Sequence, residues 1–145
     1  MIKNFFSFKN LGGEYLALQN EIRLGTPTAA FGLSDAHKYL LASLYEGQVL
    51  YVASDPIFAQ KAYESVKTLS GRKCTLLPAK DEVILYKDAL SKDALFKRIS
   101  AIYELTHGTD IIITDIEAVM QLFPERVEVI TFKKNCELDY ASIPE

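Results

Sequence analysis

The chain is short of cysteine, of excess positive charge and of long apolar runs, and each shortage excludes a class of protein. Its 145 residues include two cysteines, Cys74 and Cys136, which are too few and too far apart for a disulfide framework or a zinc site. We expect both to be reduced residues that pack in the interior. The formal net charge of −3 argues against a free-standing nucleic-acid binder, which usually carries a basic face.

The apolar runs are also too short for export or membrane insertion. The first residues contain one lysine, Lys3, but no apolar stretch long enough for a signal peptide, and no segment approaches the length that crosses a bilayer. We therefore predict a cytoplasmic protein without a membrane partner. The remaining composition, 49% hydrophobic and 24% charged, is that of a globular domain with a core of its own.

Helical and strand-like patterns alternate through most of the chain. Apolar residues at helical spacing predict helices over residues 14–24, 36–45, 56–69, 92–106 and 116–122. Apolar runs rich in β-favouring residues predict strands over residues 28–31, 48–53, 73–77, 110–115 and 127–132. Residues 79–91 are interpreted as a loop with a short irregular segment. This order predicts an α/β fold, a three-layer sandwich with a mainly parallel sheet.

The helical spacing also predicts which side chains face the interior. In the first helix these are Tyr15, Leu18 and Ile22. In the helix over residues 56–69 the predicted stripe consists of Phe58, Ala62, Val66 and Leu69. In the helix over residues 92–106 it consists of Leu95, Phe96, Ile99, Ile102 and Tyr103.

The stretch between residues 31 and 39 resembles a phosphate-binding loop that has lost two of its binding positions. A P-loop reads G-x-x-x-x-G-K-[ST], in which glycines expose backbone N–H groups, the lysine reaches the phosphates and the hydroxyl holds magnesium. Gly32 and Lys38 keep this spacing. His37 replaces the second glycine, and Tyr39 replaces the Ser or Thr that magnesium needs. We therefore expect a vestigial loop made of Gly32, Ser34, His37, Lys38 and Tyr39, without a working ATPase site.

Plainer interpretations of these residues stay open. A Gly and a Lys six residues apart are common, so the stretch is also consistent with an ordinary strand-to-helix turn and with Lys38 as a solvated residue at a helix start. Asp115 could be a Walker B acid, but an N-cap for the following helix is favoured because no second acidic residue adjoins it. His107 is expected to lie at a helix end rather than to act in catalysis.

These features together resemble the amino-terminal region of the bacterial transcription-repair coupling factor (Mfd) family, which is similar to domain 1 of the excision-repair protein UvrB. The resemblance spans residues 14–145 and includes the decayed loop from Gly32 to Lys38. Further matches are Leu77-Pro78 followed by Glu82 and Tyr86, Arg98 before Ile102-Tyr103-Glu104-Leu105, and Val119-Met120-Gln121 with Pro124. Asp81 and Leu85 depart from the family, which commonly has tryptophan and proline there.

The resemblance implies a degenerate P-loop NTPase-like fold, with residues 1–126 forming a UvrB-like domain 1a and residues 127–145 beginning a UvrA-binding-type domain. Ser142 and Pro144 are typical of a helix start, so we expect the chain to be a piece of a longer protein. The resemblance further implies that UvrA binds through the following domain, and that RNA polymerase and DNA bind through domains further downstream. ATP and magnesium are expected only for the motor of the whole protein, and no cofactor for this chain.

The leading hypothesis is therefore a non-catalytic scaffold for nucleotide excision repair, which supports UvrA recruitment and packs against other domains of the same protein. The alternative is a divergent P-loop domain that binds or hydrolyses NTP, with a main-chain nest still holding an anion. Lost magnesium and γ-phosphate contacts would remove much of the stabilisation that phosphoryl transfer needs. The apolar run at residues 127–132 is expected to fray or to pair with another molecule, giving a strand-swapped or edge-paired dimer.

Overall fold

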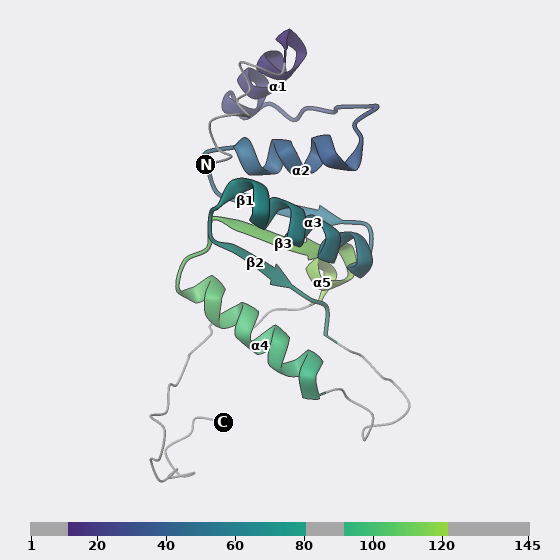
Figure 1. The fold of residues 1–145 in the computed structure, drawn as a ribbon, viewed down its shortest axis with the longest axis vertical. Coiled ribbons are helices and arrows are strands. Elements are labelled where there is room, and N and C mark those ends of the chain that lie inside the picture. Colours follow the sequence, from purple (N-terminus) through teal and green to yellow (C-terminus); the bar gives the residue numbers. More distant parts are fainter. Residues whose placement is uncertain (1–11, 81–91, 122–145) are drawn as a thin grey trace.

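Three parallel strands lie at the centre of the fold (Figure 1). The computed structural model describes residues 12–80 and 92–121. The strands are β1 (Val49–Ala53), β2 (Cys74–Leu77) and β3 (Ile111–Asp115), and the order β1-β3-β2 places the last strand between the first two. Ile111 pairs with Val49 on one side and with Cys74 on the other, so these three side chains share one face of the sheet.

After the first helix, helices alternate with the strands, as the sequence pattern predicts. The helices of the described ranges are α1 (Gly13–Arg23), α2 (Asp35–Leu44), α3 (Pro56–Ser70), α4 (Lys92–Thr106) and α5 (Ile116–Met120). The signals at the ends of α3 show why the bounds are so clear. A carboxylate oxygen of Asp55 accepts hydrogen bonds from the backbone N–H groups of Ile57 (2.9 Å) and Phe58 (3.0 Å), and Gly71 ends the helix at φ 57°.

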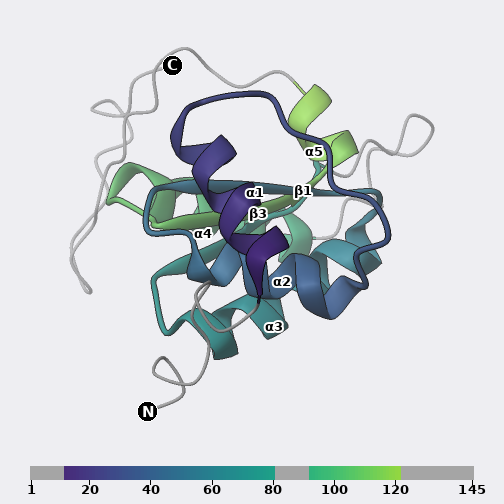
Figure 2. The same ribbon diagram turned by 90° about the horizontal axis from the view of Figure 1, so that it is seen from above.

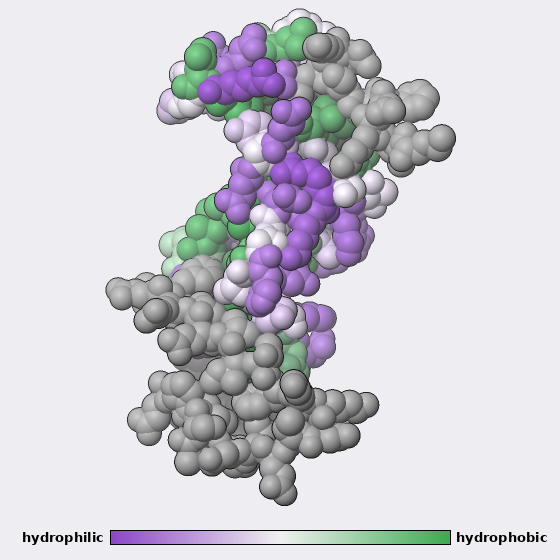
Figure 3. Space-filling view, turned by 90° about the vertical axis from the view of Figure 1, so that its left-hand side faces the viewer, coloured by the Kyte–Doolittle hydropathy of each residue, from purple (hydrophilic) through white to green (hydrophobic). Residues whose placement is uncertain are grey.

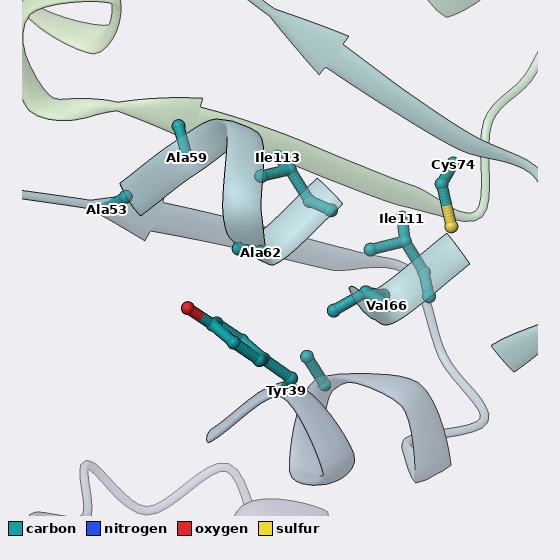
Figure 4. Close-up of a cluster of buried hydrophobic side chains, with 9 residues drawn as sticks. Tyr39, Ala53, Ala59, Ala62, Val66, Cys74, Ile111 and Ile113 are labelled. Carbon is teal, nitrogen blue, oxygen red and sulfur yellow. The ribbon is translucent and has the colours of Figure 1, made fainter. Parts of the chain in front are cut away.

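The main core lies between the sheet and two helices on one face, α2 and α3 (Figure 4). Ile111 and Ile113 of β3 and Val66 of α3 have no exposed surface. Each such side chain contributes about 1.5–3 kcal/mol by burial. The buried cluster consists of Tyr39, Ala42, Ala53, Ala59, Ala62, Val66, Cys74, Ile111 and Ile113.

The opposite face of the sheet is covered mainly by α4, over β2. Thr75 belongs to this face, and its hydroxyl donates a 2.8 Å hydrogen bond to the carboxylate of Glu104 in α4. Arg98 of α4 is buried and donates to the carbonyl of Pro78, just after β2. Figure 2 shows α5 on the side of the sheet away from α3. The predicted α/β architecture, with a parallel sheet and helices on both sides, is therefore confirmed.

The strand predicted over residues 28–31 is wrong. These residues form no strand, and all of them are exposed, with Phe31 at 91%. The short apolar run satisfied the sequence pattern, but a strand needs a partner, and this segment pairs with no strand of the described sheet.

The predicted inner face of α4 is also wrong. Of the five predicted residues Leu95, Phe96, Ile99 and Tyr103 are exposed and Ile102 is half-buried, whereas Arg98 and Ala101 are buried. Small and polar residues face the sheet because Ala101 allows close approach and Arg98 reaches a backbone carbonyl, and neither property is visible in apolar periodicity. Phe58 in α3 is likewise exposed at 41%, and α1 buries none of its residues.

Other predictions fall partly or wholly on residues outside the described ranges. Cys74 is buried and free, as predicted, but Cys136 lies outside. The strand over residues 127–132, the domain boundary at 126 and 127 and most of the loop over residues 79–91 also lie outside. The same holds for the dimer predicted from residues 127–132.

Candidate functional site

The candidate site is the loop over residues 32–38, which leads into the N-terminus of α2. Helix α2 runs opposite to β1, so this loop lies at the carboxyl end of the strands (Figure 1). The Tyr39 ring at the start of α2 lies 6.1 Å, centroid to centroid, from the ring of Tyr51 in β1. In open parallel sheets ligands bind at this edge, so the position suits a binding loop.

Backbone geometry at the start of the loop keeps one feature of a phosphate-binding turn. Gly32 has φ 73°, a left-handed conformation that glycine adopts without strain. Ser34 then serves as the N-cap of α2, and its hydroxyl accepts a hydrogen bond from the backbone N–H of His37 (3.5 Å). The same hydroxyl lies 2.9 Å from Nδ1 of the His37 ring. The loop is therefore an ordinary capped helix start.

Lys38, the residue that would reach a phosphate, is held by its own helix. Its ammonium nitrogen lies 3.0 Å from a carboxylate oxygen of Asp35, one turn earlier. Both side chains are about half exposed. The hydrogen bond and charge of Asp35 raise the pKa of Lys38. Asp35 also places a negative charge in the first turn of α2, which stabilises the helix dipole but repels an anion.

Tyr39, at the position of the magnesium-binding hydroxyl, belongs to the core. Its side chain is 8% exposed and lies between α2 and the sheet with the buried residues of α3 (Figure 4). Burial raises the pKa of its hydroxyl. The following turn is closed by Ser43, whose hydroxyl donates to the backbone carbonyl of Tyr39 at 2.7 Å. Tyr39 therefore works as a packing residue of the core.

The predicted site residues thus come together, but their binding groups are already engaged. Ser34 caps the helix, Lys38 pairs with Asp35, and Tyr39 is buried. A phosphate would have to displace the ion pair and would find no small hydroxyl for magnesium. What remains is a helix N-terminus with free backbone dipoles beside a carboxylate.

Asp115 ends β3 beside Ala53, the last residue of β1. Its side chain is 2% exposed and accepts a 2.9 Å hydrogen bond from the backbone N–H of Ala118. This is the N-cap arrangement favoured by the sequence. The carboxylate therefore stabilises the start of α5.

Sequence reasoning missed a cavity of about 490 Å³ at the free side of β2, between α3 and α4. Its wall is mostly apolar and includes Ala59, Leu76 and Phe96. Its charged side chains are engaged with neighbours: Glu104 accepts from Thr75, and Lys97 forms a 2.7 Å ion pair with Asp93. Apolar periodicity could not have found this cavity, because it places Phe96 on the inward stripe of the helix, whereas the side chain lines the cavity wall.

His107 lies at the end of α4, as predicted. It is exposed, and its Nδ1 lies 2.9 Å from the carbonyl oxygen of Tyr103. The centroids of the Tyr103 and His107 rings are 4.0 Å apart. Within residues 12–80 and 92–121, no group of three or more His, Cys, Asp and Glu side chains is arranged to hold a metal ion. Over the same residues, no helix combines the length and the apolar character needed to cross a bilayer.

Comparison with models of protein families, with curated proteins and with solved structures found no match.

Proposed function

We propose that this chain is a non-catalytic scaffold module of a transcription-coupled repair factor similar to the Mfd family. The observation that supports this proposal most directly is the engaged state of the vestigial loop, above all the 3.0 Å ion pair between Lys38 and Asp35. A loop that has turned its phosphate-binding lysine into a helix-stabilising residue suits a domain whose role is structural. The degenerate P-loop NTPase-like and UvrB-like identity of the fold belongs to this proposal.

In this role the module supports the UvrA-recruiting domain that begins at residue 127 and packs against other parts of a longer protein. Several large apolar side chains remain on the surface of the described residues, as a module with such neighbours requires. Leu24, Phe31, Leu50, Ile57, Phe96 and Met120 are each more than half exposed. Burying each against a neighbouring domain would contribute on the order of 1 kcal/mol.

Binding to purified UvrA tests the repair assignment. The whole protein that contains this chain is expected to bind immobilised UvrA in surface plasmon resonance. The same protein lacking the domain that begins at residue 127 is expected not to bind. A whole protein that fails to bind UvrA would contradict the repair assignment, and binding that survives the deletion would contradict the supporting role of residues 1–126.

The second candidate is a divergent NTP-binding domain, and two observations favour it. Gly32 has a left-handed φ of 73°, and the N-terminus of α2 lies at the carboxyl edge of the sheet, where the first N–H groups of a helix lack partners within the helix. The carboxylate of Asp35 at the same helix end disfavours it. Micromolar affinity for MgATP would support this candidate against the scaffold.

A further inference from the structure

Strand β1 is an edge strand of the sheet that the described residues form. Among the described residues, β1 pairs only with β3. The N–H of Val49 donates to the carbonyl of Asp110 at 3.0 Å, so by the alternation of a strand the N–H groups of Leu50 and Val52 point to the open side. Free edges are normally blunted by charge or proline, and β1 has neither.

The side chains of Leu50 and Val52 add an apolar surface to this open edge. Leu50 is 59% exposed and Val52 is 45% exposed, on the face of the sheet opposite α3. Figure 3 shows hydrophobic surface beside hydrophilic surface on the side of the molecule that lies at the left of Figure 1. A strand added at the edge would satisfy the backbone groups and shield part of both side chains.

The segment over residues 26–31 has the properties of that missing strand. It connects α1 to α2, and its large apolar residue, Phe31, is 91% exposed. Gly25 at one end has φ 71° and Gly32 at the other has φ 73°, with no atom within 4 Å of an added Cβ at either position. Two glycines in open space are suited to act as hinges for the segment between them. A cavity of about 350 Å³ lies between this segment and α1, so the two are not closely packed over their whole length.

The handedness of the fold selects the place where this segment can join the sheet. The connection from β1 to β2 runs through α3 on one face, and the return from β2 to β3 runs through α4 on the other, as right-handed crossovers require. A parallel strand outside β1 that leads through α2 into β1 needs α2 on the face of α3. Helix α2 already packs there. The connection over residues 32–48 is also longer than the dozen or so residues that a crossover needs.

We propose that residues 28–31 swing about Gly25 and Gly32 and add to the free edge of β1 as a fourth parallel strand. Thr28 and Ala30 are small enough to lie beneath α2, whereas Ala29 and Phe31 extend the exposed surface of Leu50 and Val52. This pairs Ala29 with Leu50 and Phe31 with Val52. In this register the N–H of Ala30 donates to the carbonyl of Leu50, and the N–H of Ala29 points away from β1.

The added strand acts as a built-in guard of the sheet edge. In the docked arrangement β1 has no free edge. In the present arrangement no strand of residues 12–80 and 92–121 covers this edge, which can pair with a strand from a second copy or from a partner. The inference goes beyond the scaffold function and does not depend on it, because it rests only on the geometry of residues 12–80 and 92–121.

Hydrogen exchange of single amides, followed by NMR in the intact chain, tests the proposal. The amides of Leu50 and Val52 are expected to exchange at least about tenfold more slowly in the natural sequence than in Ala30→Pro, which removes the donor to Leu50. Ala29→Pro is the matched control, because a proline whose nitrogen faces away from the neighbouring strand is tolerated at an edge. The amide of Tyr51, which faces β3, reports on the integrity of the sheet in every variant.

Each outcome decides the proposal. Protection that is lost in Ala30→Pro, kept in Ala29→Pro and independent of protein concentration supports it. Increased self-association of Ala30→Pro in sedimentation velocity supports the guarding role. Rapid exchange of Leu50 and Val52 in the natural sequence overturns the proposal, as does equal protection in both variants. Loss of protection in Val129→Pro but not in Ala30→Pro would show that residues 127–132 pair with β1. Protection that grows with protein concentration would show that a second copy pairs with β1. Either result overturns the proposal.

Discussion

The ammonium group of Lys38 lies 3.0 Å from the carboxylate of Asp35, inside the first turn of α2. In a working phosphate-binding loop the corresponding lysine is free to reach the nucleotide. Here the lysine neutralises an acidic residue that itself stabilises the helix N-terminus. This pair gives Lys38 a role in stabilising the first turn of α2 that needs no ligand.

Asp115→Ala and Asp115→Asn distinguish an N-cap from a catalytic acid. Asp115→Ala is expected to lower the free energy of unfolding by about 1–2 kcal/mol, because the buried N–H of Ala118 loses its acceptor. Asp115→Asn is expected to cost much less, since asparagine is also a good N-cap. Urea denaturation followed by circular dichroism measures both. Equal losses in the two variants would show that the negative charge, and not the cap, is what matters.

Ile113→Ala and Ile99→Ala are a matched pair that tests the location of the core. Ile113 has no exposed surface, so its truncation is expected to cost about 2–5 kcal/mol. Ile99 is 53% exposed in α4, and its truncation is expected to change stability by no more than about 0.5 kcal/mol. The urea midpoints of the two variants give the comparison. A large loss in Ile99→Ala would place that residue in an interface and contradict the described face of α4.

Arg98→Leu tests the polar contact between α4 and the end of β2. The variant is expected to lose about 1–3 kcal/mol, because the carbonyl of Pro78 loses the guanidinium that it accepts from. Burial lowers the pKa of Arg98, so the side chain is held in place against a desolvation cost. Arg98→Lys is expected to recover only part of the loss, since an ammonium lacks the planar fork. Full stability of Arg98→Leu in thermal unfolding would show that this contact is dispensable.

The loss of folding stability at acid pH is expected to depend on Asp55. Hydrogen bonds from the backbone of Phe58 and Ile57, together with that from Ser54, hold the pKa of this carboxyl below its usual value near 3.8. A lowered pKa stabilises the folded state above the unfolded-state value, and the contribution is lost as the pH falls through the folded-state pKa. Thermal unfolding between about pH 5 and pH 2 should therefore show a shallower acid dependence in Asp55→Asn, which caps without titrating. The same fall in thermal stability with pH in the natural sequence and in Asp55→Asn would contradict this role.

Much of the fold could be predicted from the sequence, because its signals are local. Asp55 and Gly71 bound α3, and the run over residues 110–115 predicts β3, since a central strand buried on both faces is nearly continuous in apolar residues. The face of α4 could not be predicted, because Arg98 faces the sheet through a hydrogen bond to Pro78, a residue twenty positions away. Apolar spacing carries no information about such a partner.

In the candidate site, too, the contacts within one helical turn could be predicted and the contacts with distant elements could not. Ser34 as a cap and Asp35 beside Lys38 are relationships within one helical turn, and they follow from the spacing of the residues. The burial of Tyr39 depends on α3 and β1, which no local pattern places. The failed strand at residues 28–31 has the same cause, because whether an apolar run becomes a strand depends on an edge supplied from elsewhere in the fold.

Isothermal titration of the chain with MgATP tests most directly the claim that the loop has lost its nucleotide chemistry. No saturable heat is expected up to about 1 mM nucleotide, a limit that corresponds to a binding free energy weaker than about −4 kcal/mol. Lys38→Ala is expected to behave like the natural sequence, and Lys73→Ala serves as the control for an exposed lysine outside the loop. Micromolar binding that disappears in Lys38→Ala and persists in Lys73→Ala would contradict the account.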